Sequence, residues 1–210
     1  MARSNRHRKG KLSYSVVVDG KTEVWYFQMM KKYERLPRID IIPEIPKRKK
    51  LREQFNTVVD KSKIYDKVFW VIDLDTILKE NNEAPRGSMS ILNVLQQYIK
   101  KLQLNFSGNV KVFINNPCLE YWFLLHFKET GQYFDNCDKV INELNSTEEL
   151  ADYEKKERYF KRKNKDIYFR LKPHQRYAME NAVKQGTFDF NAPDRSISEM
   201  YLALSDLFKQ

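Results

Sequence analysis

The stretch Val68-Phe69-Trp70-Val71-Ile72-Asp73-Leu74-Asp75 decides the fold. Its first five residues are apolar and mostly β-branched or aromatic, which is typical of a strand that is covered on both faces. Such strands belong to mostly parallel sheets with helices packed on both sides. The two aspartates follow at the carboxyl end, where open α/β sheets bind their ligands. This stretch therefore predicts an α/β fold and the location of a functional site.

Strand and helix patterns alternate on either side of this stretch. We expect further strands at residues 14–18, 39–45 and 110–114, and helices at residues 21–35, 88–102 and 118–127. Pro43 should confine the strand at 39–45 to an edge of the sheet. Residues 79–88 are polar and indicate a loop. Asn116 should cap the helix at 118–127, and Pro117 should open it.

The chain divides into three expected parts. Residues 1–12 form a basic, flexible arm, residues 13–130 an α/β core with a mostly parallel sheet flanked by helices, and residues 131–210 a helical extension packed on that core. A final amphipathic helix is expected at residues 197–207. The pattern leaves open whether the second half is a cap on the sheet or a small subdomain.

Composition narrows the class of protein. Of 210 residues, 41% are hydrophobic, which is enough to fill a core and excludes a disordered chain. No apolar run approaches the roughly 20 residues that span a bilayer, so we expect a cytoplasmic protein without a membrane partner. The net charge of +10 favours a polyanionic partner such as nucleic acid. Cys118 and Cys137 lack the spacing of a zinc site or a disulfide framework, and we expect two buried thiols.

Carboxylates follow the expected strands. Asp19 comes after the first strand, Asp73 and Asp75 after the third, and Glu120 one helical turn after the fourth; Glu23 lies four residues beyond Asp19. If the extended chain persists, Asp73 and Asp75 project from one face. Gathered carboxylates require a cation, and oxygen ligands alone favour Mg²⁺ or Mn²⁺ over zinc. The alternative is that these acids cap helices or favour helix dipoles.

Three segments carry a resemblance to a known family. They are Val16-Val17-Val18-Asp19-Gly20-Lys21-Thr22-Glu23, then Val71-Ile72-Asp73-Leu74-Asp75, then Asn116-Pro117-Cys118-Leu119-Glu120-Tyr121-Trp122-Phe123-Leu124-Leu125-His126-Phe127. In this order they resemble the RloB-like family of bacterial anti-phage loci, from about residue 13 through most of the chain. The third segment is the most specific of them.

The resemblance implies a Toprim-like fold that holds Mg²⁺ and acts on phosphodiester bonds. It places Asp19 in the general acid/base or metal position and makes Asp73 and Asp75 metal ligands, so that these three form the catalytic set. Glu23 and Glu120 become additional metal ligands, as in two-metal nucleases. The family pattern has Glu where this chain has Asp19, which is one methylene shorter. This departure weakens the expectation of catalysis more than that of metal binding.

Basic segments are the candidate nucleic-acid contacts. They comprise Arg48, Lys49, Lys50, Lys161, Arg162 and Lys163. The second group is interleaved with Tyr153, Tyr159, Phe160 and Tyr168, and flat rings beside cations suit single-strand or RNA binding. The alternative is a solvated helix face whose aromatic rings turn into the core.

Three functions follow as hypotheses. The first is a metal-dependent nuclease in phage defence, with RNA or tRNA mildly preferred as substrate. The second is a catalytically weakened module that binds nucleic acid, or an ATPase partner or inhibitor from a neighbouring gene. The third is a nucleotidyl or phosphoryl transferase. Gly20-Lys21-Thr22 lacks the glycine that a P-loop needs at residue 15, which excludes a P-loop nucleotide site.

Overall fold

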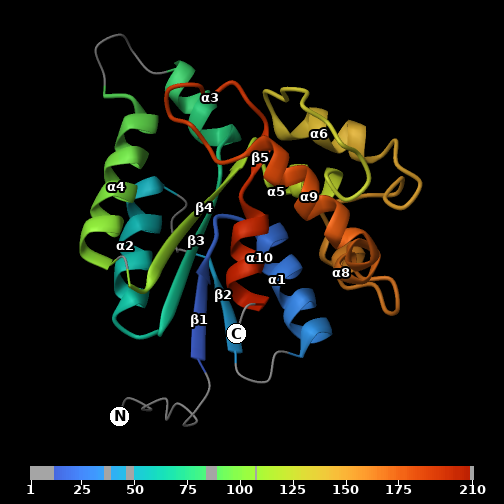
Figure 1. Cartoon of the computed structure of the whole chain (residues 1–210), viewed down its shortest axis with the longest axis horizontal. Coiled ribbons are helices and arrows are strands. Elements are labelled where there is room, and N and C mark those ends of the chain that lie inside the picture. The colour runs from blue at the N-terminus through green and yellow to red at the C-terminus, as the bar shows by residue number, and fades with distance from the viewer. Residues whose placement is uncertain (1–11, 36–38, 46–49, 84–88, 107, 209–210) are drawn as a thin grey trace.

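The sheet is open, and most of its strands are parallel (Figure 1). The computed structural model describes residues 12–35, 39–45, 50–83, 89–106 and 108–208. Within them, five strands pair in the order β2-β1-β3-β4-β5. They are β1 (Leu12–Val17), β2 (Ile39–Glu44), β3 (Lys67–Asp73), β4 (Val110–Asn116) and β5 (Ile197–Ser198). The first four are mutually parallel and β5 is antiparallel to β4, which confirms the predicted mostly parallel α/β fold.

The order of the strands creates a switch point between β1 and β3. From β1 the chain moves to β2 on one side, and it then returns to place β3 on the other side of β1. The parallel register pairs Val17 of β1 with Trp70 of β3, so the carboxyl ends of the two strands lie side by side. Ligands of open α/β sheets bind in the crevice beyond such a switch point. The segments after β1 and β3 therefore lie where a ligand is expected.

Helices cover both faces of the sheet (Figure 1). One face carries α2 (Leu51–Ser62), α3 (Asp75–Glu83) and α4 (Ile91–Phe106). Their apolar side chains pack with alternate residues of the strands, such as Trp70 and Ile72. The opposite face carries α1 (Lys21–Glu34) and α5 (Leu119–Leu124), which pack against Phe69 and Val71 of β3. Alternation along β3 thus divides the apolar residues into two cores.

The second half of the chain completes the core on the α1 side. It contains α6 (Cys137–Leu144), α7 (Glu157–Phe160), α8 (Ile167–Leu171), the 3₁₀ helix η1 (Lys172–His174), α9 (Gln175–Gln185) and α10 (Met200–Phe208). One buried cluster extends from Tyr14 of β1 to Leu207 of α10. The Asn181 amide of α9 also donates to the carbonyl of Leu125, at 2.9 Å. These helices therefore pack directly on the sheet core.

Several local predictions were wrong. Residues 79–83 belong to α3 rather than to a loop, and the helix α2 at residues 51–62 was not among the expected helices. β4 continues to Asn116, and Cys118 occupies the N-cap position of α5 after a cis Asn116–Pro117 bond. Two residues of the expected last helix form β5.

No helix of the described segments is long and apolar enough to cross a membrane. The predicted basic arm lies almost wholly outside the described residues.

Candidate metal centre

Three carboxylates converge beyond the switch point. Asp19 follows β1, Glu23 lies in the first turn of α1, and Asp73 is the last residue of β3. Each offers an oxygen atom, and these atoms all lie within 4.8 Å of one another. The sequence predicted this meeting because the carboxyl ends of parallel strands share one edge of the sheet. The arrangement has the size and the ligand type of a divalent-cation site.

Burial makes this concentration of negative charge costly. Glu23 is 3% exposed and Asp73 is 9% exposed. Burial, followed by the charges of Asp19 and Glu120, raises the pKa of Glu23 to about 8. Burial, followed by the charges of Glu23, Asp19 and Glu120, also raises the pKa of Asp73 well above its usual range. A bound cation would favour the charged forms of these carboxylates.

One oxygen of Glu23 lacks a partner. Within the described residues, Oε2 of Glu23 is fully buried and makes no hydrogen bond. Gly20 leaves room for this atom, because a Cβ at Gly20 would lie 2.5 Å from Oε2 of Glu23. A buried carboxylate oxygen without a donor needs a compensating ligand. The oxygen-only donor set fits Mg²⁺ or Mn²⁺.

Asp73 is held by a chain of hydrogen bonds that the sequence did not reveal. Its Oδ2 accepts from the backbone N–H of Leu119 at 3.1 Å, and its Oδ1 accepts from the amide of Asn115 at 3.1 Å. The Oδ1 atom of Asn115 accepts in turn from the Ser198 hydroxyl of β5 at 2.7 Å. Hydrogen bonds of this kind fix the orientation of a carboxylate that could bind a metal. Ser198 gave no sequence signal, because its role depends on the pairing of β5 with β4.

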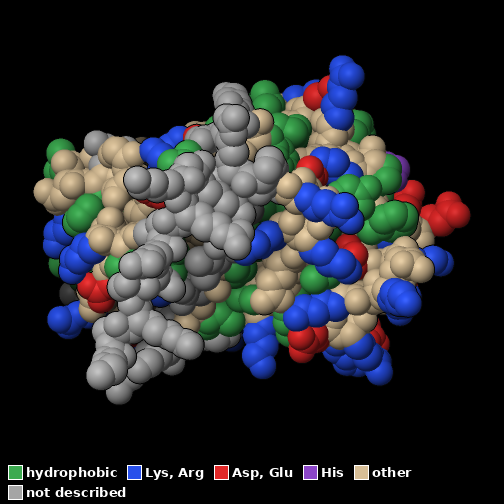
Figure 2. Space-filling view, turned by 90° about the horizontal axis from the view of Figure 1, so that it is seen from below, with side chains coloured by type: hydrophobic (Ala, Val, Ile, Leu, Met, Phe, Trp, Pro, Cys, Tyr) green, Lys and Arg blue, Asp and Glu red, His purple; other side chains and the backbone are tan. Residues whose placement is uncertain are grey.

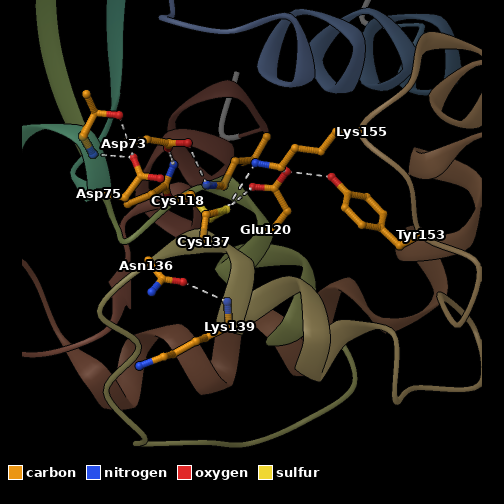
Figure 3. The surroundings of a disulfide bond; sticks show 12 residues. Asp73, Asp75, Cys118, Glu120, Asn136, Cys137, Lys139, Tyr153 and Lys155 are labelled. Carbon is orange, nitrogen blue, oxygen red and sulfur yellow. Dashed lines mark hydrogen bonds and ion pairs between the residues drawn. A yellow bond between two sulfur atoms is a disulfide. The ribbon is translucent and has the colours of Figure 1, made fainter. Parts of the chain in front are cut away.

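Glu120 has its own partners, Tyr153 and Lys155 (Figure 3). The side chain is fully buried in α5, and its charge contributes to the raised pKa values of Glu23 and Asp73. Its Oε1 accepts a hydrogen bond from the Tyr153 hydroxyl at 2.7 Å and forms an ion pair with Lys155 Nζ at 3.1 Å. Glu120 is therefore outside the group formed by Asp19, Glu23 and Asp73.

Asp75 is also outside this group. β3 ends at Asp73 and α3 begins at Asp75, so the extended chain that would have placed both side chains on one face does not persist. The Oδ1 atom of Asp75 accepts from the backbone N–H of Thr76 at 2.6 Å. Asp75 lines a different cavity, together with Asn136 and Cys137. The expectation that Asp73 and Asp75 project together was wrong for this reason.

The two cysteines form a disulfide, so the expectation of buried thiols was wrong (Figure 3). Cys118 precedes α5 and Cys137 begins α6, and their Cα atoms are 5.8 Å apart. The pairing depends on the packing of α6 against α5, which the spacing in the sequence could not show. Sγ of Cys137 lies 3.1 Å from Oε2 of Glu120. The disulfide therefore borders the carboxylate of Glu120.

The candidate nucleic-acid contacts have different positions. Arg48 and Lys49 lie outside the described residues, whereas Lys50 lines a cavity together with Asp19 and Asp73. Lys161 pairs with Glu157, and Arg162 with Asp152; Lys163 is exposed. On the side of the molecule that holds α8, Lys and Arg side chains alternate with acidic ones (Figure 2).

The aromatic rings between residues 153 and 168 belong to the core. Tyr153, Tyr159, Phe160 and Tyr168 are each at most 5% exposed. They pack with Phe123 of α5 and Tyr26 of α1 in a continuous group of rings. This result favours the alternative reading of the segment over a stacking surface for bases.

The protein is thus an α/β protein with three clustered carboxylates at the switch point of its sheet. A family model described as RloB-like protein matches residues 14–207, and the chain therefore belongs to the RloB-like family. This match confirms the resemblance seen in the sequence. The searches of curated proteins and of solved structures gave no match.

Proposed function

We propose that this protein is a divalent-cation-dependent nuclease that hydrolyses phosphodiester bonds. The observation that carries the proposal is the convergence of Asp19, Glu23 and Asp73 at the switch point, with a buried oxygen of Glu23 that has no hydrogen-bond partner in the described structure. Carboxylates arranged in this way hold Mg²⁺ or Mn²⁺ in enzymes that act on phosphates. The positive net charge supports a polyanionic substrate.

In this proposal, the residues of the site have different roles. Asp19, Glu23 and Asp73 would hold the cation, which when bound supplies a Lewis acid for the phosphate and activates a water molecule. Leu119 and Asn115 keep the carboxylate of Asp73 in place. The adjacent Lys50 and Arg52 would neutralise phosphate charge at the mouth of the site. The ion pair between Lys155 and Glu120 offsets part of the negative charge behind the centre.

The proposal also includes a biological role and a substrate. The resemblance to proteins of anti-phage loci supports a role in defence, with RNA, including tRNA, as the first substrate to test. An ATPase or an inhibitor from a neighbouring gene would then control the activity. The presence of Asp19 in place of Glu supports a second candidate, a weakened module that binds nucleic acid or such a partner without cutting.

The test is a cleavage panel with matched variants. Total tRNA, single-stranded RNA, plasmid DNA and single-stranded DNA are incubated with Mg²⁺, Mn²⁺ or EDTA. We expect cation-dependent cleavage by the natural protein and none by Asp73→Asn. The two proteins should have equal thermal stability in EDTA, which shows that the variant is folded. Mn²⁺ binding without cleavage would support the binding module. Absence of Mn²⁺ binding by the natural protein would contradict the nuclease.

A further inference from the structure

The crevice beside the three carboxylates has two chemically different ends. It is a cavity of about 630 Å³ among α2, α3 and α4, on the sheet face opposite α1. One end carries Asp19 and Asp73, with the exposed Lys50 and Arg52 beside them. This volume lies within the range of about 300–1,000 Å³ that ligand pockets occupy. The cavity therefore offers space for a small, charged molecule or for part of a larger one.

Toward α3 and α4 the cavity is lined mainly by apolar side chains, beside Thr76 and Glu80 of α3. Ile77 of α3 and Ile91, Val94 and Tyr98 of α4 form its wall. The Tyr98 ring is fixed by stacking on Phe55 of α2, with centroids 4.3 Å apart and planes inclined by 18°. A rigid apolar wall of this kind suits a flat, weakly polar group.

The distribution of charge matches one nucleotide of a strand. We propose that the phosphate lies at the carboxylate and lysine end while the attached base enters the cavity toward Ile91, Val94 and Tyr98. This inference rests on the proposed nuclease function and adds to it the form of the substrate. A base that is stacked and paired in a duplex cannot enter such a cavity without leaving the helix, at a cost in free energy. The protein therefore acts on unpaired nucleotides, in single strands or loops.

Two residues of α4 provide a matched test. Val94 lines the cavity, whereas the adjacent Asn93 is exposed on the same helix. Val94→Trp would fill the space for the base, and Asn93→Trp would add the same ring outside it. The probe is a short single strand of RNA or DNA that contains 2-aminopurine, which becomes more fluorescent when it leaves the base stack. Titrations with Ca²⁺ in place of Mg²⁺ keep a cation at the carboxylates, a denaturing gel checks that the probe stays intact, and a duplex of the same sequence serves as the competing substrate.

We expect the natural protein and Asn93→Trp to bind the single strand more tightly than the duplex, with a rise in fluorescence. Val94→Trp should lose about tenfold in affinity, the scale of one base contact, and should keep Mn²⁺ binding. Ile91→Trp serves as a second filling variant if Val94→Trp is unfolded by circular dichroism. Equal binding by Val94→Trp and the natural protein, or equal affinity for duplex and single strand, would overturn the inference. Failure of the nuclease proposal would appear separately, as missing Mn²⁺ binding by the natural protein.

Discussion

Oδ2 of Asp73 accepts a hydrogen bond from the backbone N–H of Leu119, at 3.1 Å. This contact joins the end of β3 to the first turn of α5, which are separated by 46 residues in the sequence. Asp75, two residues further along the chain, has a different partner: its Oδ1 accepts from the backbone N–H of Thr76. The two aspartates therefore have different surroundings, although the sequence presents them as a pair.

The first prediction concerns these two aspartates. Asp73→Asn removes a cation ligand and should weaken Mn²⁺ binding more than about 100-fold, which exceeds the usual effect of an outer-shell change. Asp75→Asn, its matched control, should weaken binding less than about tenfold. Isothermal titration calorimetry measures both. Equal losses in the two variants would show that Asp75 is a ligand after all.

The second prediction concerns the space at Gly20. Ala at this position is compatible with the extended backbone there, but its Cβ would meet Oε2 of Glu23 at 2.5 Å. Gly20→Ala should therefore displace the carboxylate and weaken Mn²⁺ binding by about tenfold or more. Gly131→Ala is the control, because a Cβ at Gly131 meets no atom within 4 Å. Unchanged Mn²⁺ affinity in Gly20→Ala would exclude Glu23 from the centre.

The third prediction concerns the pH dependence of stability without metal. Because the pKa of Glu23 is raised to about 8 in the folded protein, the folded state keeps a proton that the unfolded state has lost. The free energy of unfolding in EDTA should therefore fall as pH rises from 6.5 to 8, by up to about 1.4 kcal/mol per pH unit for each retained proton. Denaturant titrations at several pH values measure this slope.

The effects of Glu23 and of the buried His126 on the stability of the fold occur in different pH ranges. Burial lowers the pKa of His126 to about 3, so it destabilises the fold as pH falls below 6.5 and is neutral in both states above that value. The variant Glu23→Gln should have a smaller slope between pH 6.5 and 8. Saturating Mg²⁺ should also abolish the trend, because binding releases the proton and the Glu23 carboxylate is then deprotonated in both states. An unchanged slope in Glu23→Gln would contradict the assignment.

The fourth prediction concerns the disulfide. The bond between Cys118 and Cys137 closes a loop with a sequence separation of 19 residues. Its removal should lower the free energy of unfolding by about 3 kcal/mol, through loss of the constraint on the unfolded chain. This corresponds to a decrease in melting temperature of about 6–12 °C for a protein of this size. Calorimetry of Cys137→Ser against the oxidised natural protein measures it. A matching decrease on adding a reductant to the natural protein would assign the effect to the bond.

The sequence predicted those features that depend on local patterns. The apolar runs predicted β1, β3 and β4, and Pro43 predicted the edge position of β2. The acids at the strand ends predicted the meeting of Asp19 with Asp73. Residues whose position depends on distant packing were missed. Ser198 and the disulfide needed the return of the second half of the chain, and the rings at residues 153–168 read equally well as a surface or as core.

The hydrogen bonds from Ser198 through Asn115 to Asp73 have a consequence for synthesis of the protein. The ribosome makes the segments that carry Asp19, Glu23 and Asp73 well before Ser198, which completes the support of Asp73. Asp73 reaches its full set of bonds only after residue 198 has left the exit tunnel and β5 has paired with β4. A chain in which β5 has not yet paired with β4 therefore lacks the full support of the Asp73 carboxylate.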